Sequence, residues 1–305
     1  EKTLEEEEHK LAQSEREEDT DNKPLPDFDI TSSVIKKARC LNQRVSSTGT
    51  SAYLSALYNQ ETAKYSREIK SLKKTLDEIF KSDKEECSRS TRGSYNIIRG
   101  TVGTSARIFD KKRDPGNFKD AAIVLAVDLS GSMACGTKMH NARKCAIVFA
   151  EALSQLKIPY YIMGFSADMY GADAVHKHFV DWSNKRSDRE TLVSMEANGN
   201  NFDGYSIRYA SKLLEGRNAN NKILFIISDG EPVCNYYSYD TGISDTVNAI
   251  KDARKICTTF GIAVGRGCRP EVLQGMYGKD FIYCEDDQLL SNTLGKKMAK
   301  LLRAG

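Results

Sequence analysis

Two apolar runs, each followed at once by oxygen-bearing side chains, constrain the fold of this chain most strongly. Ala121 to Val127 leads into Asp128-Leu129-Ser130-Gly131-Ser132, and Ile223 to Ile227 leads into Ser228-Asp229-Gly230. Each run has the length and the β-branched content of a strand that is buried on both faces of a parallel sheet. In open α/β sheets ligands bind at the carboxyl ends of the strands, so we expect the two tips to face one common site.

From Asp120 onward, predicted strands and helices alternate, which is the pattern of a parallel sheet covered by helices on both faces. The expected strands are Ala121 to Val127, Tyr160 to Phe165, His176 to Trp182, Ile223 to Ile227, Ile262 to Val264 and Phe281 to Cys284. The expected helices include Met139 to Leu156, Ser206 to Leu214, Asp245 to Phe260 and a last one from Gln288. We therefore predict an α/β, doubly wound, mostly parallel six-stranded sheet at residues 119–305, preceded by a helical region.

The residues before this sheet divide into two parts. Residues 1–23 hold ten acidic and four basic residues, a charge of −6 in a chain whose net charge is +3, and Pro24 and Pro26 follow. This composition predicts an acidic, disordered linker at residues 1–27. Residues 28–118 are basic and are predicted to be mainly helical. Their clearest helix runs from Thr62 to Lys81, and its basic face is more typical of a solvated surface than of a nucleic-acid site.

The apolar residues expected on the other face of that helix are Tyr65, Ile69, Leu72, Leu76, Ile79 and Phe80.

Several classes of protein are disfavoured by composition. No stretch approaches the roughly 18 apolar residues of a membrane span, and the start shown lacks the apolar core of a signal peptide. The eight cysteines include no C-x-x-C pair, which is typical of reduced thiols in a cytoplasmic protein. Because the sequence starts at Glu1 rather than Met, we expect it to be the C-terminal part of a longer protein. His176 and His178 are expected to be a solvent-facing pair on a strand rather than metal ligands.

The chemistry of the two tips favours a hard divalent cation. Mg²⁺ binds carboxylate, hydroxyl and water oxygens, and the spacing of Asp128, Ser130 and Ser132 places three such side chains on one loop at a strand end. This Asp-x-Ser-x-Ser pattern resembles the metal-ion-dependent adhesion site (MIDAS) of von Willebrand factor A (VWA) domains. The resemblance covers about residues 119–304, and it implies that Asp128, Ser130, Ser132 and Asp229 bind Mg²⁺, or another divalent cation such as Mn²⁺ or Ca²⁺.

The loop from Asn198 to Gly204 occupies the place where many VWA domains supply a threonine ligand. This loop contains no threonine, and Asp203 is its best placed oxygen donor. The Asn-x-Asp-Gly arrangement is similar to the VWA subunit of cobaltochelatase, which works with an AAA+ ATPase. Pro232-Val233-Cys234 lacks the acidic pair of that subunit, and the segment between Phe165 and Asn201 is too short for its insertion. The resemblance therefore implies the broader class that partners MoxR-like AAA+ ATPases, or their clients, and not cobalt insertion.

The exchange of aspartate for threonine changes the expected charge of the site. With Asp128, Asp203 and Asp229 ionised, the protein contributes −3 against +2 from the ion, which predicts firm metal holding and weaker attraction for a carboxylate of a partner. Alternatively, Asp203 caps the helix at Ser206 and does not bind the metal, because aspartate is a favoured cap.

Catalysis is not expected. No histidine base is placed at the site, and no G-x-G-x-x-G or phosphate-loop motif follows the first strand. A divalent-metal-dependent protein-interaction module is the preferred interpretation. Two alternatives stay open: a Mg²⁺-dependent phosphatase or phosphotransferase that uses Asp128, and a secreted adhesion protein.

Overall fold

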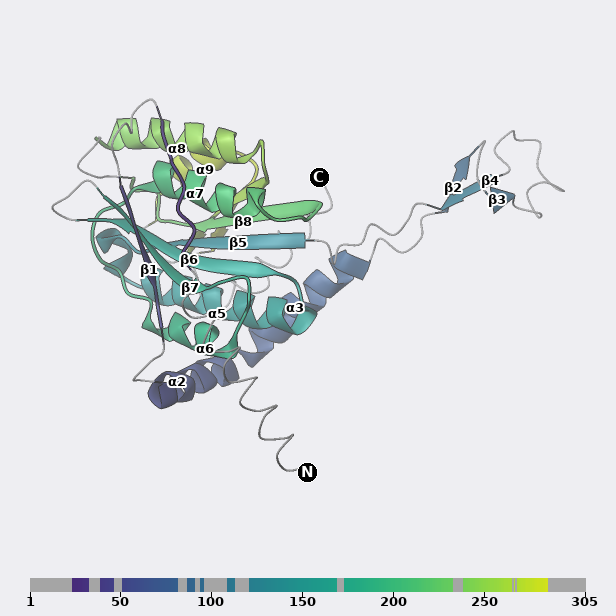
Figure 1. Ribbon diagram of the computed structural model, residues 1–305, viewed down its shortest axis with the longest axis horizontal. Helices are drawn as coiled ribbons and strands as arrows, with labels where there is room; N and C mark the ends of the chain where they lie inside the picture. The colour runs from purple at the N-terminus through teal and green to yellow at the C-terminus, as the bar shows by residue number, and fades with distance from the viewer. Residues whose placement is uncertain are drawn as a thin grey trace.

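The computed structural model describes residues 24–32, 39–46, 51–81, 87–90, 94–95, 109–112, 121–168, 173–232, 238–264, 266 and 268–284. The main sheet has seven strands in the order β1-β7-β6-β5-β8-β9-β10. These strands are β1 (Cys40–Arg44), β5 (Ala121–Asp128), β6 (Tyr160–Ala167), β7 (Ala174–Val180), β8 (Asn221–Ile227), β9 (Thr258–Val264) and β10 (Phe281–Cys284). Figure 1 labels β1, β7, β6, β5 and β8 of this sheet. A second, three-stranded sheet contains β2 (Cys87–Ser90), β3 (Ser94–Tyr95) and β4 (Phe109–Lys112).

The α/β, doubly wound and mostly parallel sheet that the sequence predicts is confirmed. Pairs β5–β6, β5–β8, β8–β9 and β9–β10 are parallel, and β6–β7 is antiparallel. The helices are α2 (Ser51–Lys64), α3 (Ser66–Lys81), α5 (Lys138–Leu156), α6 (Arg186–Glu190), α7 (Asp203–Glu215), α8 (Tyr239–Ala253) and α9 (Pro270–Tyr277). Helices α2, α3 and α5 lie on one side of the sheet, and α7, α8 and α9 lie on the other (Figure 1).

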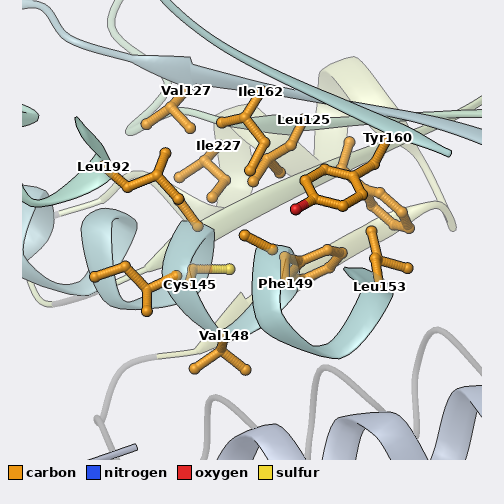
Figure 2. Close-up of a cluster of buried hydrophobic side chains, with 14 of the residues drawn as sticks. Leu125, Val127, Cys145, Val148, Phe149, Leu153, Tyr160, Ile162, Leu192 and Ile227 are labelled. Atoms are coloured by element: carbon orange, nitrogen blue, oxygen red, sulfur yellow. The ribbon is translucent and has the colours of Figure 1, made fainter. Parts of the chain in front are cut away.

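The core on the α5 side is built from alternate residues of the central strands and the apolar faces of α5 and α3. Leu125 and Val127 of β5 point toward Cys145 and Phe149 of α5 (Figure 2). All seven residues from Ala121 to Val127 are buried, because helices cover both faces of β5. This packing fixes the end of β5, and with it the position of Asp128.

A seventh strand comes from the region predicted to be mainly helical. Strand β1 pairs in parallel with β7, and Cys40 lies opposite Ala174. His176 and His178 of β7 are consequently 0% and 2% exposed, so the prediction of a solvent-facing pair is wrong. The prediction treated β7 as an uncovered edge, whereas β1 and α7 enclose both imidazole rings.

Side chains of β1, β6 and α7 hydrogen-bond both histidines. The Cys40 Sγ lies 3.0 Å from Nδ1 of His176, whose Nε2 lies 3.0 Å from the Ser206 hydroxyl. The Tyr161 hydroxyl lies 2.7 Å from Nδ1 of His178, and Asn42 Oδ1 lies 3.0 Å from its Nε2. These contacts connect the N-terminal segment to the sheet.

The predicted helix from Thr62 to Lys81 is interrupted at Tyr65, between α2 and α3. Four of its predicted apolar positions are buried, namely Tyr65, Ile69, Leu72 and Leu76. They belong to the same hydrophobic cluster as α5, so residues from within 28–118 share a core with the main sheet. The domain boundary near residue 119 stays a prediction.

Other boundaries differ by a few residues. The helix predicted to end at Phe260 ends at Ala253, and the strand predicted to begin at Ile262 begins at Thr258. Residues 1–23 and the helix expected from Gln288 lie outside the described residues. Among the described helices, none has the length and apolar content that crossing a bilayer requires.

Candidate metal centre

The predicted site residues lie at the point where the strand order reverses. From β5 the chain continues to β6 on one side, whereas β8 flanks β5 on the other. Because β5 and β8 are parallel, the loops that follow them leave the same edge of the sheet. Asp128 is the last residue of β5, Asp229 follows β8 by two residues, and Asp203 is the first residue of α7. Such a reversal leaves a crevice between the loops that leave neighbouring strands, which is where open α/β sheets bind ligands.

Asp128 connects three loops through its two carboxylate oxygens. Its Oδ1 accepts a 2.7 Å hydrogen bond from the backbone N–H of Ser130. Its Oδ2 accepts hydrogen bonds from Asn201 Nδ2 at 2.8 Å and from the Ser228 hydroxyl at 3.2 Å. Asp128 is completely buried, so its carboxylate connects the three loops in the interior of the protein.

The two serines of the first loop present their hydroxyls to each other. The Oγ atoms of Ser130 and Ser132 lie 3.0 Å apart, and the loop continues as a 3₁₀ turn at Gly131–Ala134. Ser130 is buried, whereas Ser132 is half-buried and Gly131 is exposed. Solvent therefore reaches this loop at Gly131 and Ser132.

A close backbone approach holds the third loop against the first. The N–H of Gly131 donates to the carbonyl of Gly199 at 2.9 Å. Gly199 has a φ of +83°, and a Cβ at this position would lie 2.3 Å from the carbonyl oxygen of Ala167. Only glycine fits both requirements, because other residues rarely adopt this φ and their Cβ would collide with the backbone.

Asp203 lies inside the first turn of α7 rather than at its cap. The N-cap residue is Phe202, and it has no side-chain capping hydrogen bond. Asp203 is 2% exposed, and its Oδ1 has no hydrogen-bond partner among the described residues. Oδ1 of Asn201 is also buried without a described partner. These two oxygens are free to bind a cation, although ligation by Asp203 stays a prediction.

Asp229 forms a buried ion pair that the sequence analysis did not predict. Lys138, the first residue of α5, places its Nζ 2.8 Å from Oδ2 of Asp229 and 3.3 Å from the carbonyl oxygen of Ser132. The side chains of Lys138 and Asp229 are 6% and 0% exposed. Burial opposes the charge of Lys138, but the hydrogen bond and the charge of Asp229 outweigh it and raise the pKa of Lys138.

The carboxylates repel one another in this enclosed space. Burial raises the pKa of Asp128 to about 7, and the charge of Asp229 adds to the rise, while hydrogen bonds from Ser130 and Ser228 oppose it. Burial, followed by the charges of Asp128 and Asp229, raises the pKa of Asp203 well above its usual value. A cation at the site would relieve this repulsion.

The donor set suits the divalent ion that the Asp-x-Ser-x-Ser pattern implies. Three buried carboxylates, two hydroxyls and an unpartnered Asp203 oxygen are hard ligands of the kind that Mg²⁺ binds. In the described part of the chain, no three His, Cys, Asp or Glu side chains form a metal-binding group by themselves. The serine hydroxyls and water would therefore have to complete the coordination of an ion.

The predicted residues Asp128, Ser130 and Ser132 are in contact, and Asp203 and Asp229 lie near enough to raise the pKa values described above. Sequence reasoning missed three further contributors: Asn201, Ser228 and Lys138. Asn201 and Ser228 stand in the very loops that carry the predicted ligands, so a search of those loops for hydrogen-bond donors would have found them. No pattern in the sequence indicated Lys138. Its positive charge changes the predicted net charge of the protein groups at the site from −3 to −2.

Comparison with known proteins agrees with this fold. The sequence model of the family described as "Cobalamin biosynthesis protein CobT VWA domain" matches residues 108–179 and 177–247, which include all five predicted ligands. A curated relative, "Uncharacterized protein YojO" of Bacillus subtilis (strain 168), is 30% identical over 225 residues. The match covers 69% of this chain and 34% of the relative, so the chain spans about a third of that protein's length.

Solved structures with similarity to this chain include two bacterial proteins. A "von Willebrand factor type A" structure from Catenulispora acidiphila has 18% identity and a TM-score of 0.44, over 60% of this chain and 42% of its own. The "conserved hypothetical protein BatB" from Bacteroides thetaiotaomicron has 15% identity and a TM-score of 0.46, over 61% of this chain and 100% of its own.

Proposed function

We propose that this chain is a VWA-domain protein and that it works as a divalent-metal-dependent module that binds another protein. The observation that carries the proposal is the cluster of buried carboxylates and serine hydroxyls where the loops after β5 and β8 meet the start of α7. In this proposal Asp128, Ser130, Ser132, Asp203 and Asp229 hold the ion. The ion would supply a Lewis-acidic centre that attracts oxygen donors of a partner.

The residues of the protein would perform separate tasks in this module. Asp128 is enclosed and accepts three hydrogen bonds, so it fixes the arrangement of the three loops and keeps acceptor capacity for the ion. The hydroxyls of Ser130 and Ser132 would bind the ion, with Ser132 nearer to solvent. Asp203, with its unpartnered oxygen, would add the third negative charge. The proposed ion is Mg²⁺, with Mn²⁺ and Ca²⁺ as alternatives.

The rim of the site offers polar groups for a protein partner. The exposed guanidinium of Arg269 lies 3.0 Å from a carboxylate oxygen of Glu231 and 5.2 Å from the centroid of the Tyr239 ring. The backbone N–H of Arg269 donates to the carbonyl of Asp229 at 3.2 Å, so this rim is attached directly to the site. Arginine and tyrosine are frequent at protein interfaces.

We propose a MoxR-like AAA+ ATPase, or its client, as the partner. Support comes from the match to the CobT VWA family and from the Asn-x-Asp-Gly loop, which resembles the cobaltochelatase subunit that works with such an ATPase. We also propose that the protein acts in the cytoplasm. In the described part of the chain Cys40, Cys135 and Cys257 are free thiols, which supports this location because disulfides persist mainly in oxidising compartments.

The proposal does not include catalysis. A phosphatase that uses Asp128 as its nucleophile needs an accessible carboxylate. Asp128 has no exposed surface and three hydrogen-bond donors on its two oxygens, which disfavours attack on a substrate. A phosphatase assay with para-nitrophenyl phosphate tests this point, and activity that Asp128→Ala abolishes would contradict the proposal.

The partner is tested by co-purification of the tagged chain with a MoxR-like AAA+ ATPase of the same organism. In about 5 mM Mg²⁺ we expect the two proteins to form a complex. EDTA should dissociate this complex, and Ser132→Ala should weaken it. Lys255→Ala is a control, because Lys255 is exposed and precedes β9, whereas the site lies at the carboxyl ends of the strands. A complex that survives both EDTA and Asp128→Ala would contradict a metal-dependent interface.

A further inference from the structure

Lys138 is the one feature of the site that an oxygen-only metal centre does not require. Its ammonium group is enclosed between the first loop and the tip of β8, with contacts to Asp229 Oδ2 and to the Ser132 carbonyl. Only 6% of its side chain is exposed. Lysine is rarely buried to this extent without a specific charged partner.

The charges at the site account for this lysine. Three ionised aspartates contribute −3, Lys138 contributes +1, and a divalent ion would bring the sum to zero. Without Lys138, the loaded site with its three ionised carboxylates would carry −1. Such an uncompensated charge is costly in a space that water reaches poorly.

The geometry also places Lys138 in competition with an ion. Oδ2 of Asp229 already accepts the ammonium hydrogen bond, and Oδ1 of Asp229 accepts a 3.3 Å hydrogen bond from the N–H of Glu231. An ion that approaches Asp229 must use the remaining capacity of these oxygens, or displace the lysine. It must also bind near a fixed positive charge, which repels it.

We propose that Lys138 is a built-in counter-cation that balances the third carboxylate, Asp203, and weakens divalent-ion binding, so that the site exchanges its ion readily. This inference rests on the proposed metal-binding function. It replaces the prediction of firm metal holding, which counted three carboxylates and no cation. Lys138 is a positioning residue in this scheme, because it acts through Asp229 and the charge of the site.

Titration of MgCl₂ into the whole chain, followed by calorimetry at constant pH, tests the proposal. We expect Lys138→Met to tighten Mg²⁺ binding about tenfold or more, since a repelling charge is removed and Asp229 Oδ2 becomes free. Lys138→Arg, which keeps the charge, should bind within about threefold of the wild type. Asp203→Asn should weaken binding about tenfold, and the double variant Lys138→Met/Asp203→Asn should return to within about threefold of the wild type.

A second measurement separates this role from ordinary structural stabilisation. In EDTA, Lys138→Met should melt at a lower temperature than the wild type, because it leaves the carboxylates uncompensated. Its gain in melting temperature on addition of Mg²⁺ should nevertheless be larger. Lys138→Gln provides the same comparison if the methionine variant does not fold. Lys255→Met is the control, because it removes an exposed lysine and should change neither quantity.

The outcomes distinguish this inference from the function on which it rests. If the wild type binds Mg²⁺ and Asp128→Ala does not, while Lys138→Met and Lys138→Gln bind with wild-type affinity, the counter-cation role is wrong and the metal site stands. If the wild type binds no Mg²⁺ but the Lys138 variants do, lysine has replaced the ion and the metal-dependent function is wrong. Absence of binding by every variant contradicts both.

Discussion

Acid should destabilise this protein through His178, which is buried and neutral in the fold. Burial lowers the pKa of His178 to about 4, the positive charge of Arg44 adds to the shift, and Asp181 opposes it. In the unfolded chain the pKa returns to about 6.5. Above pH 6.5 neither state holds a proton at this position. As the pH falls below 6.5, the unfolded chain is protonated first, so the free energy of unfolding decreases.

The magnitude follows from the two pKa values. Each pH unit between 6.5 and 4 removes about 1.4 kcal/mol from the free energy of unfolding, which gives a loss of about 2 kcal/mol at pH 5. His176, whose pKa is lowered well below its usual value by burial and by His178, changes the free energy of unfolding in the same direction. Asp128 has a raised pKa and acts in the opposite direction. A comparison with a variant is therefore needed to isolate His178.

Urea denaturation of the wild type and of His178→Gln, at several values between pH 7.5 and 5.0, provides that comparison. We expect the wild type to lose about 2 kcal/mol more than His178→Gln over this range. His140→Gln is the matched control: His140 is exposed on α5, and its variant should follow the wild type. Parallel curves for the wild type and His178→Gln would refute the argument, because they would show that the folded state binds this proton as readily as the unfolded state.

Three other changes should alter stability by amounts that urea or thermal denaturation detects. Nη2 of the buried Arg208 lies 3.0 Å from Asp245, so Asp245→Ala removes its main partner and should lower the free energy of unfolding by about 3 kcal/mol. Asp252→Ala, at a more exposed contact, should lower it by less than about 1 kcal/mol. Gly199→Ala should cost more than about 1 kcal/mol, since φ is +83° and the new Cβ meets Ala167; a neutral result would mean that the loop can move. A chain that starts at residue 119 loses β1 and α3 and should melt at least about 10 °C lower; an unchanged melting temperature would show that these elements add nothing.

Local patterns were sufficient to predict six of the seven strands of the main sheet and the loops that share one edge of it. The apolar runs that end at Val127 and Ile227 identify buried parallel strands, and the residues that follow a strand end necessarily share one edge of the sheet. The position of Asp203 near this edge was predictable because its loop leads directly into α7, whereas its role as a ligand stays a prediction. Each of these inferences uses residues that are neighbours in sequence, or the general geometry of parallel sheets.

The features that sequence reasoning missed depend on contacts between distant residues. Strand β1 pairs Cys40 with Ala174, and nothing near either residue indicates that partner. The two histidines were therefore assigned to solvent. Lys138 was missed for the same reason, since its partner Asp229 is 91 positions away and a lysine in the first turn of a helix is ordinarily exposed.

The central claim, that the loops after β5 and β8 and the start of α7 hold a divalent ion, is tested most directly by counting bound Mn²⁺. Electron paramagnetic resonance of Mn²⁺ titrated into the protein distinguishes bound from free ion. We predict one bound Mn²⁺ per wild-type chain, displaced by excess Mg²⁺, and none at the same concentrations in Asp128→Ala with Ser130→Ala. Equal Mn²⁺ binding by the wild type and this double variant would contradict the claim, and so would absence of binding by the folded wild type.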